Sequence, residues 1–229
     1  MDSFPNELID AIIDNLPRSS LCSTSLVARR WRIRSQQRIL NSITFSSRYK
    51  VDCWYSDVQR GRNRIASYVR SAEFHRIDSW SEPELFGRML KGFRSLTTLN
   101  MYRCAVPDEL LRQISHGECG RGITTLSIWF PGWELPRKTS LILSLPDLKR
   151  LTVQSDGTIP REQSSAPITS QRRSLDMLEL RSIANEFAET LIQAQLTSRY
   201  ICLGGAISSV YRFIAISSET LVSLMLNGL

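Results

Sequence analysis

Side chains that could act as nucleophiles, acid–base groups or metal ligands are few and scattered in this sequence of 229 residues. The two histidines are His75 and His116. His116 forms an H-x-x-C pair with Cys119, but no further ligand follows at the spacing that a zinc site needs. The glycines of 117–122 lack the Lys-Ser/Thr of a phosphate-binding loop, and the G-x-S-x-G and H-E-x-x-H motifs are absent. We therefore expect a loop at 116–122 and a protein that is not an enzyme and uses no metal or cofactor.

Cysteine usage and hydropathy indicate the cellular setting. The five cysteines, at positions 22, 53, 104, 119 and 202, are odd in number and form no C-x-x-C pair, which predicts reduced thiols. No apolar run approaches the roughly 20 residues of a membrane span, and the N-terminus lacks the pattern of a signal peptide. These features predict an intracellular protein, cytoplasmic and/or nuclear, that does not contact membranes.

The apolar residues of the first 31 positions repeat at helical spacing. Leu8, Ile9, Ile12, Ile13 and Leu16 share one side of a helix, with Pro5 suited to its first turn and Pro17 ending it. Ser19 or Ser20 is placed to cap a second short helix through Leu21, and a third segment carries Leu26, Val27 and Trp31. About 30 residues enclose too little apolar surface to be stable alone, so this unit needs a neighbour.

The pattern from Phe4 to Trp31 resembles the F-box, whose consensus runs from L-P-x-E-L to V-x-R-x-W. It departs from that consensus at Phe4, Ser20 and Ala28. The resemblance, which extends to the large fungal F-box family, implies a helical module that docks on a Skp-family adaptor and, through it, joins a cullin-based SCF ubiquitin ligase. We assign docking to the module's apolar and proline positions, namely Phe4, Pro5, Leu8, Ile9, Ile12, Leu16, Pro17, Leu21, Val27 and Trp31. The alternative is a helical cap whose apolar stripe packs on its own chain.

Basic residues are concentrated just after this unit. Residues 29–70 hold eleven Arg or Lys against Asp52 and Asp57, a local charge of +9 within a total of +7. Interleaved aromatic residues make a nucleic-acid-binding module one alternative function, because cations can follow a phosphate backbone while rings stack on bases. No helix-turn-helix or RNA-binding signature accompanies the block, so we favour a solvated surface that partly faces a protein partner; a nuclear-import signal stays open.

From residue 40 onward a template of apolar-x-x-apolar-x-apolar recurs every 23 to 29 residues. Period-2 alternation within each set predicts a short strand with one buried face, and helical patterns follow between the sets, most clearly at 83–93, 107–116, 183–196 and 206–216. The sets are Leu40/Ile43/Phe45, Val69/Ala72/Phe74, Leu96/Leu99/Met101, Ile123/Leu126/Ile128, Leu148/Leu151/Val153, Leu175/Leu178/Leu180, Ser198/Ile201/Leu203 and Leu221/Leu224/Leu226.

This array resembles a leucine-rich-repeat solenoid of parallel strands and helices. It is degenerate, because the Asn or Cys expected after each strand occurs only as Cys104. We predict an α+β or α/β protein with an F-box module at residues 1–38 and a solenoid at 39–229, of about eight units, the last incomplete. The polar segment 155–174 is expected to be a mobile loop. An α/β sheet of ordinary topology is the alternative.

Residues that alternate with the buried positions would line the concave face of such a solenoid. Large aromatic residues and arginines are frequent binding anchors, so we assign client binding to Tyr102, Trp129, Arg150, Arg181 and Tyr200. The aromatic segment 129–133 is expected to pack over the helices rather than protrude.

Together these patterns predict the substrate-recognition adaptor of an SCF-type ligase, with the F-box on a Skp-family adaptor and the solenoid presenting a client protein. Two alternatives remain open: the nucleic-acid-binding module described above, and an F-box protein that acts outside a ligase or is a truncated remnant.

Overall fold

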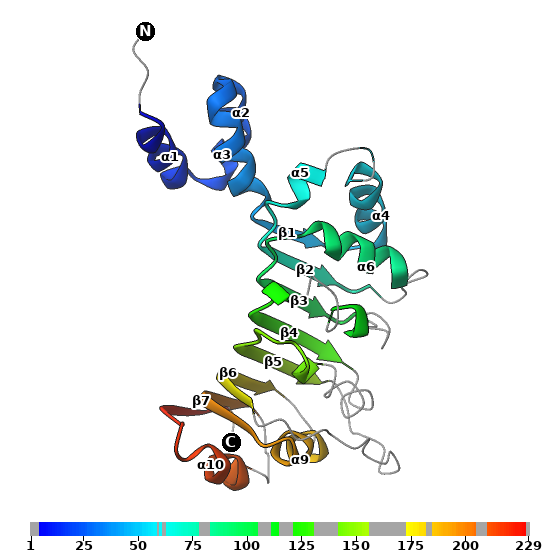
Figure 1. The fold of residues 1–229 in the computed structure, drawn as a ribbon, viewed down its shortest axis with the longest axis vertical. Helices are drawn as coiled ribbons and strands as arrows, with labels where there is room; N and C mark the ends of the chain where they lie inside the picture. The colour runs from blue at the N-terminus through cyan, green and yellow to red at the C-terminus, as the bar shows by residue number, and fades with distance from the viewer. Residues whose placement is uncertain are drawn as a thin grey trace.

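The computed structural model describes residues 5–58, 60, 63–77, 83–104, 111–114, 121–130, 142–155, 173–181, 185–204 and 210–227. A small helical unit is followed by one sheet of eight parallel strands with helices packed against it (Figure 1). The helical unit lies at the β1 end of the sheet, α4 and α6 lie beside the first strands, and α9 and α10 lie near its far end.

The helical unit consists of α1 (Asn6–Asn15), the 3-10 turn η1 (Arg18–Ser20), α2 (Leu21–Val27) and α3 (Arg29–Leu40). The predicted amphipathic helix before Pro17 is confirmed, although Pro5 is its N-cap rather than a residue of the first turn. The predicted side-chain cap on the second helix is wrong. Ser20 makes no capping bond, and instead the Thr24 hydroxyl donates to the Ser20 carbonyl at 2.8 Å.

Ile9, Ile13 and Leu21 form the small core of the helical unit, and Leu16, Trp31 and Ile39 pack against it. Burial of Ile9 and Ile13 follows from their i, i+4 spacing on the inner face of α1. Three short helices therefore share a core that is separate from that of the sheet.

Arginine side chains close the ends of these helices. Arg38 on α3 donates to the carbonyls of Ile13 and Leu16 at the end of α1, the second at 3.0 Å. Arg18 donates to the carbonyls of Ile39 and Ser42 at 2.9 and 2.7 Å, where α3 meets the sheet. Terminal carbonyls of a helix lack partners inside the helix, so these arginines satisfy them and join the elements.

Each of the eight strands pairs in parallel with its neighbours in chain order. The middle apolar positions of the template align from Ile43 through Ala72, Leu99, Leu126, Leu151, Leu178 and Ile201 to Leu224. The eight predicted strands are therefore confirmed, and equivalent positions of the eight sets lie side by side in the sheet. The strands are β1 (Ser42–Phe45), β2 (Ser71–His75), β3 (Thr98–Tyr102), β4 (Thr125–Phe130), β5 (Arg150–Ser155), β6 (Arg173–Arg181), β7 (Leu196–Gly204) and β8 (Ser223–Asn227).

The helices between strands are α4 (Arg48–Asp57), α5 (Asn63–Ala66), α6 (Pro83–Gly92), α9 (Asn185–Gln193) and α10 (Val210–Ser217). Three of the four predicted helical segments correspond to α6, α9 and α10, each with shifted or shorter ends. Of the fourth, residues 111–114 are helical and the rest lies outside the described residues. Ser155 and residues 173–174, predicted as ends of a mobile loop, belong to strands; residues 156–172 lie outside the description.

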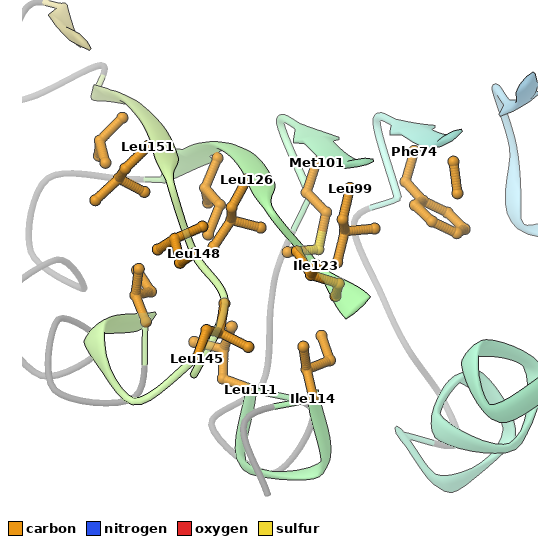
Figure 2. Packing of buried hydrophobic residues seen from close by; sticks show 14 of the residues in the cluster. Phe74, Leu99, Met101, Leu111, Ile114, Ile123, Leu126, Leu145, Leu148 and Leu151 are labelled. Carbon is orange, nitrogen blue, oxygen red and sulfur yellow. The ribbon is translucent and has the colours of Figure 1, made fainter. Parts of the chain in front are cut away.

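The core of the sheet lies between its apolar face and the helices. In Figure 2, Leu111, Ile114 and Leu145 lie across from Ile123, Leu126 and Leu148. Phe74 stacks on Phe45 at 5.0 Å between ring centroids and meets Phe86 of α6 edge-on at 4.7 Å. Burying such rings against each other adds to the apolar area removed from water.

The chain turns in the same way after two neighbouring strands. Arg76 after β2 and Arg103 after β3 both have positive φ, 53° and 51°, and the Arg76 amide donates to the Tyr102 carbonyl at 2.9 Å. The buried Cys104 thiol then donates to the Phe74 carbonyl at 3.3 Å, which ties this turn to the preceding strand.

Gly122 allows a close backbone contact between successive repeats. A Cβ atom there would lie 2.8 Å from the Leu96 carbonyl oxygen, so we expect Gly122→Ala to lower the free energy of unfolding by about 1–3 kcal/mol. Urea unfolding followed by circular dichroism measures the change. The control is Gly204→Ala, whose Cβ would meet no backbone atom nearer than 3.7 Å and should change stability by about 0.5 kcal/mol or less. Equal stability of the two variants would contradict this packing.

Candidate functional site

The helical unit exposes aliphatic side chains on all three of its α-helices. Leu8 and Ile12 are 51% and 44% exposed on α1, Leu26 and Val27 are 79% and 68% exposed at the end of α2, and Ile33 on α3 is 44% exposed. Leu8 and Ile12 are one turn apart on α1 and lie beside the buried pair Ile9 and Ile13, on the exposed part of the same apolar stripe. We call these five residues the exposed aliphatic set; such surface is typical of a protein-binding site.

The residues predicted to dock fall into three groups. Leu8, Ile12 and Val27 belong to the exposed aliphatic set, and Pro5 and Pro17 are exposed at the ends of α1. Ile9 and Leu21 are buried in the helical core, with Leu16 and Trp31 packed against it. Phe4 lies outside the described residues.

Leu26 and Ile33 are exposed residues that the docking assignment missed. Helical periodicity predicts which residues share a face, but it does not tell which face turns outward, because that depends on how the three helices pack. Leu26 directly precedes Val27 in the same apolar segment, and this adjacency could have indicated that Leu26 is exposed too.

An ion pair joins α1 to α3 beside this surface. The Arg34 Nε donates to Asp14 Oδ1 at 2.9 Å, and its Nη2 contacts the other carboxylate oxygen. The hydrogen bond from Arg34 holds the pKa of Asp14 below its usual value, against the opposing effect of desolvation. Arg34 and Arg38 of the basic block thus serve contacts inside the helical unit.

The sheet face opposite the core, which we call the open face, carries polar residues in register. The Asn100 amide donates to Glu73 Oε1 at 3.2 Å. Farther along the sheet, Thr152 and Arg181 both donate to Glu179, at 3.2 and 2.8 Å. Glu73, Asn100, Thr152 and Glu179 belong to one row of residues aligned across the strands, which we call the central row. Hydrogen bonds from side chains on adjacent strands or on the same strand order the carboxylates of Glu73 and Glu179.

Aromatic residues and cations lie along one edge of the open face. His75 and Tyr102 stack at 4.9 Å between ring centroids, and the Arg103 guanidinium lies 4.1 Å from the centre of a Trp129 ring. Burial raises the pKa of Tyr102, as does the nearby Glu73 carboxylate. Burial, with the nearby Glu179, also raises the pKa of the Cys202 thiol, which disfavours its thiolate form.

The five predicted client-binding residues all lie on the open face but in two separate rows. Tyr102, Trp129 and Arg181 follow the central row toward the carboxyl ends of their strands, whereas Arg150 and Tyr200 precede it. Trp129 belongs to β4 and not to a loop; residues 131–133 of the predicted aromatic loop lie outside the described residues. Arg103 was missed because its backbone position after β3, and hence its approach to Trp129, depends on the turn there.

Within the part of the chain that the structure describes, no group of three His, Cys, Asp or Glu residues could hold a metal ion. No helix among the described residues is long and apolar enough to cross a membrane. The described residues form two exposed surfaces: the exposed aliphatic set on the helices, and the open face with its aromatic and charged side chains.

Comparison with protein families identifies the helical unit. Residues 1–42 match the family model of the F-box domain, a span that includes α1, α2 and α3 and ends at the first residue of β1. No curated protein matches the chain. F-box domains in general bind Skp-type adaptors, and the proteins that carry them are in general non-catalytic adaptors of ubiquitin ligases.

The ion pair between Asp14 and Arg34 predicts how the helical unit responds to acid. The folded-state pKa of Asp14 lies below its unfolded value of about 3.8. The ionised carboxylate therefore stabilises the folded helical unit fully above about pH 3.8, and this stabilisation is lost as the pH falls through the lower folded-state pKa. Asp14→Asn should remove this contribution at neutral pH, about 0.2–1 kcal/mol for partly exposed partners. Amide hydrogen exchange of α1 from pH 7 downward measures it. Asp147→Asn, at an exposed position outside the helical unit, is the control; the same loss in both variants would contradict a specific role for the pair.

Proposed function

We propose that this F-box protein is the substrate-recognition adaptor of an SCF-type cullin ubiquitin ligase. The F-box module docks on a Skp-family adaptor, and the sheet region presents a client protein to the ligase. The observation that carries the proposal is the exposed aliphatic set, whose side chains lie outside the small core of Ile9, Ile13 and Leu21.

The exposed and the buried residues of the docking assignment contribute to docking in different ways. Leu8, Ile12 and Val27, with Leu26 and Ile33, make direct contact, since their side chains are exposed. Ile9, Leu16, Leu21 and Trp31 hold the three helices in the docking arrangement from inside. Burial of exposed aliphatic surface contributes about 25 cal/mol per Å², so a few such side chains supply much of the binding free energy.

Charge next to the aliphatic set favours an acidic partner surface. Arg29, Arg30 and Arg32 lie at the start of α3, separated from Val27 by Ala28, and all three are exposed. Cations at the rim of an apolar patch raise the association rate with a partner of opposite charge. The docking face of the Skp-family adaptor is therefore expected to carry acidic residues around an apolar centre.

We interpret the sheet region as a degenerate leucine-rich-repeat solenoid over residues 39–229, with the F-box module at 1–38. Parallel strands in chain order and the 23- to 29-residue spacing support this interpretation. Cys104 supports it further, because its thiol donates a hydrogen bond to the Phe74 carbonyl in the preceding strand. Since α3 runs to Leu40 and β1 begins at Ser42, the junction between the two parts is short.

The client-binding surface in this proposal is the open face. Tyr102, Trp129 and Arg181 form its main group with Arg103, and Arg150 and Tyr200 extend it toward the amino ends of the strands. The stack of Tyr102 on His75 and the Arg103–Trp129 contact support the choice, because side chains ordered before binding lose less entropy on contact with a partner.

The protein's contribution to ubiquitin transfer is positioning. The complex holds a client close to a conjugating enzyme that carries ubiquitin as a thioester. This raises the effective concentration of the client's lysines near that thioester. Catalytic residues then belong to other subunits. We assign the protein to the intracellular space, cytoplasmic and/or nuclear, where such ligases act.

A nucleic-acid-binding function of residues 29–70 is less well supported. Two of its arginines, Arg34 and Arg38, bond groups of the helical unit, and Trp31 and Trp54 pack against the two cores. A strongly salt-dependent affinity for RNA or DNA would favour that function instead. Action outside a ligase would be indicated if client ubiquitination did not depend on this chain.

Leu8→Asp and Ile12→Asp should abolish docking while leaving the module folded, because both side chains are exposed in the unbound chain. A carboxylate buried in an apolar interface costs at least about 2 kcal/mol, which corresponds to about a 30-fold weaker complex or more. Calorimetry with a purified Skp-family adaptor measures affinity, and circular dichroism verifies folding. Tyr211→Asp on α10, 84% exposed, is the matched control and should bind as wild type does. Wild-type affinity of the folded Leu8→Asp variant would refute the docking surface.

Tyr102→Ala combined with Arg181→Ala should impair client recognition without affecting adaptor binding. Loss of two anchor side chains typically costs about 1 kcal/mol or more each, so clients should accumulate in cells. Quantitative proteomics of ubiquitinated proteins compares this variant with wild type and with Tyr211→Ala. If the ubiquitinated set is the same in all three cell lines, the open face is not the client site.

A further inference from the structure

A basic hollow lies where the helical unit meets the sheet. Its volume is about 800 Å³, and its lining combines Arg34 and Arg38 of α3 with Arg70, which precedes β2, and Arg94, which precedes β3. Tyr68 and Asp14 complete the charged and aromatic lining. We call this hollow the junction groove.

A second hollow of about 370 Å³ shares Arg94 and Ser67 with the junction groove. It adds Arg64, Arg88 and Lys91, the last two from α6. Cations from three separate parts of the chain therefore line two adjoining hollows. Arg88, Lys91 and Arg94 lie outside the basic block that the sequence singles out at 29–70.

The junction groove is rich in donors and poor in acceptors. Within the described ranges of the chain, its lining holds four arginines and a single acidic residue, Asp14, whose two carboxylate oxygens already accept from Arg34. Among the described residues, the guanidinium groups of Arg70 and Arg94 have no hydrogen-bond or ion-pair partner. Arg70 and Arg94 are exposed. Like charges gathered in one hollow repel one another, and a bound anion relieves that repulsion.

We propose that the junction groove binds a compact anion carrying several phosphate groups. Guanidinium groups match phosphate oxygens in a two-point geometry, and no donor of Arg70 or Arg94 is used by another of the described residues. Asn41, Ser67 and Ser95 add neutral polar groups to the same lining. The anion would contact α3 and the segments before β2 and β3 together, and so would join the helical unit to the sheet.

The lining favours a compact anion over a nucleic-acid strand. A single strand needs a succession of exposed rings on which its bases stack. Of the residues that the structure describes, Tyr68 is the one aromatic residue that lines the junction groove. The Tyr68 hydroxyl also accepts from Arg64 Nε at 3.1 Å, which draws it toward the second hollow. Trp31 and Trp54, the large rings of the basic block, pack against the cores instead.

Binding of the anion does not depend on the adaptor function proposed above, but its consequence does. In an adaptor, the F-box module and the client platform must keep a constant relative position for client lysines to reach the conjugating enzyme. An anion bound across the junction would restrict motion between the two parts.

Calorimetry of the full chain with sodium tripolyphosphate in 0.1 M salt tests the proposal. Arg70→Gln combined with Arg94→Gln should weaken binding by at least about tenfold, because two charge-assisted contacts are lost. The matched control is Arg29→Gln combined with Arg32→Gln, which removes the same charge from exposed positions of the basic block outside the groove. It should change the affinity by about twofold or less, and circular dichroism verifies that both variants fold.

Three results would overturn the proposal. They are no binding of tripolyphosphate to wild type, an equal loss of affinity in the two double variants, and preferential binding of a twelve-nucleotide single-stranded RNA that both variants weaken equally. The last two would indicate attraction to the basic block as a whole. Because the readout involves no Skp-family adaptor, a failure of the docking prediction would leave this test unaffected.

Discussion

Parallel pairing in a constant register is the constraint on which the rest of this structure depends. Each strand turns its two alternating apolar residues toward the helices, and the hydrogen bonds between neighbours hold these residues level along the sheet. A slip of one residue in any strand would move its apolar pair to the open face and bring polar residues such as Glu73 or Glu179 into the core. The register thus creates the core and, on the opposite side, the ordered rows of polar and aromatic residues.

The helical unit follows a different principle, since its three short helices enclose only a few buried residues. Arginines add to the stability that this small core provides. Arg38 donates hydrogen bonds to carbonyls at the end of α1, Arg18 donates to a carbonyl at the end of α3, and Arg34 forms an ion pair with Asp14. These contacts satisfy terminal carbonyls and leave the aliphatic residues of the outer faces exposed. Arginine contacts at the helix ends thus stabilise the unit together with its small core, and the apolar side chains of the outer faces stay available to a partner.

Much of the architecture could be predicted from local pattern alone. Period-2 alternation located the strands, and the regular spacing of the eight sets indicated which residues would align, since identical repeats place identical positions side by side. Helix ends were predicted less well, and α4 was not singled out, because its apolar residues Val51, Trp54 and Tyr55 are too few for a clear helical stripe. The separation of Arg150 and Tyr200 from Tyr102 and Trp129 followed from the register once the strands were aligned.

The sequence by itself determined the order of the elements, the buried positions of the strands and the F-box character of the N-terminus, because each depends on residues near one another in the chain. Only the tertiary structure decided which side of α1 faces outward, since that choice between Leu8 and Ile9 depends on where α2 and α3 pack. It also decided which cations meet: Arg34, Arg70 and Arg94 come from distant positions, and no local pattern predicts that they line one groove.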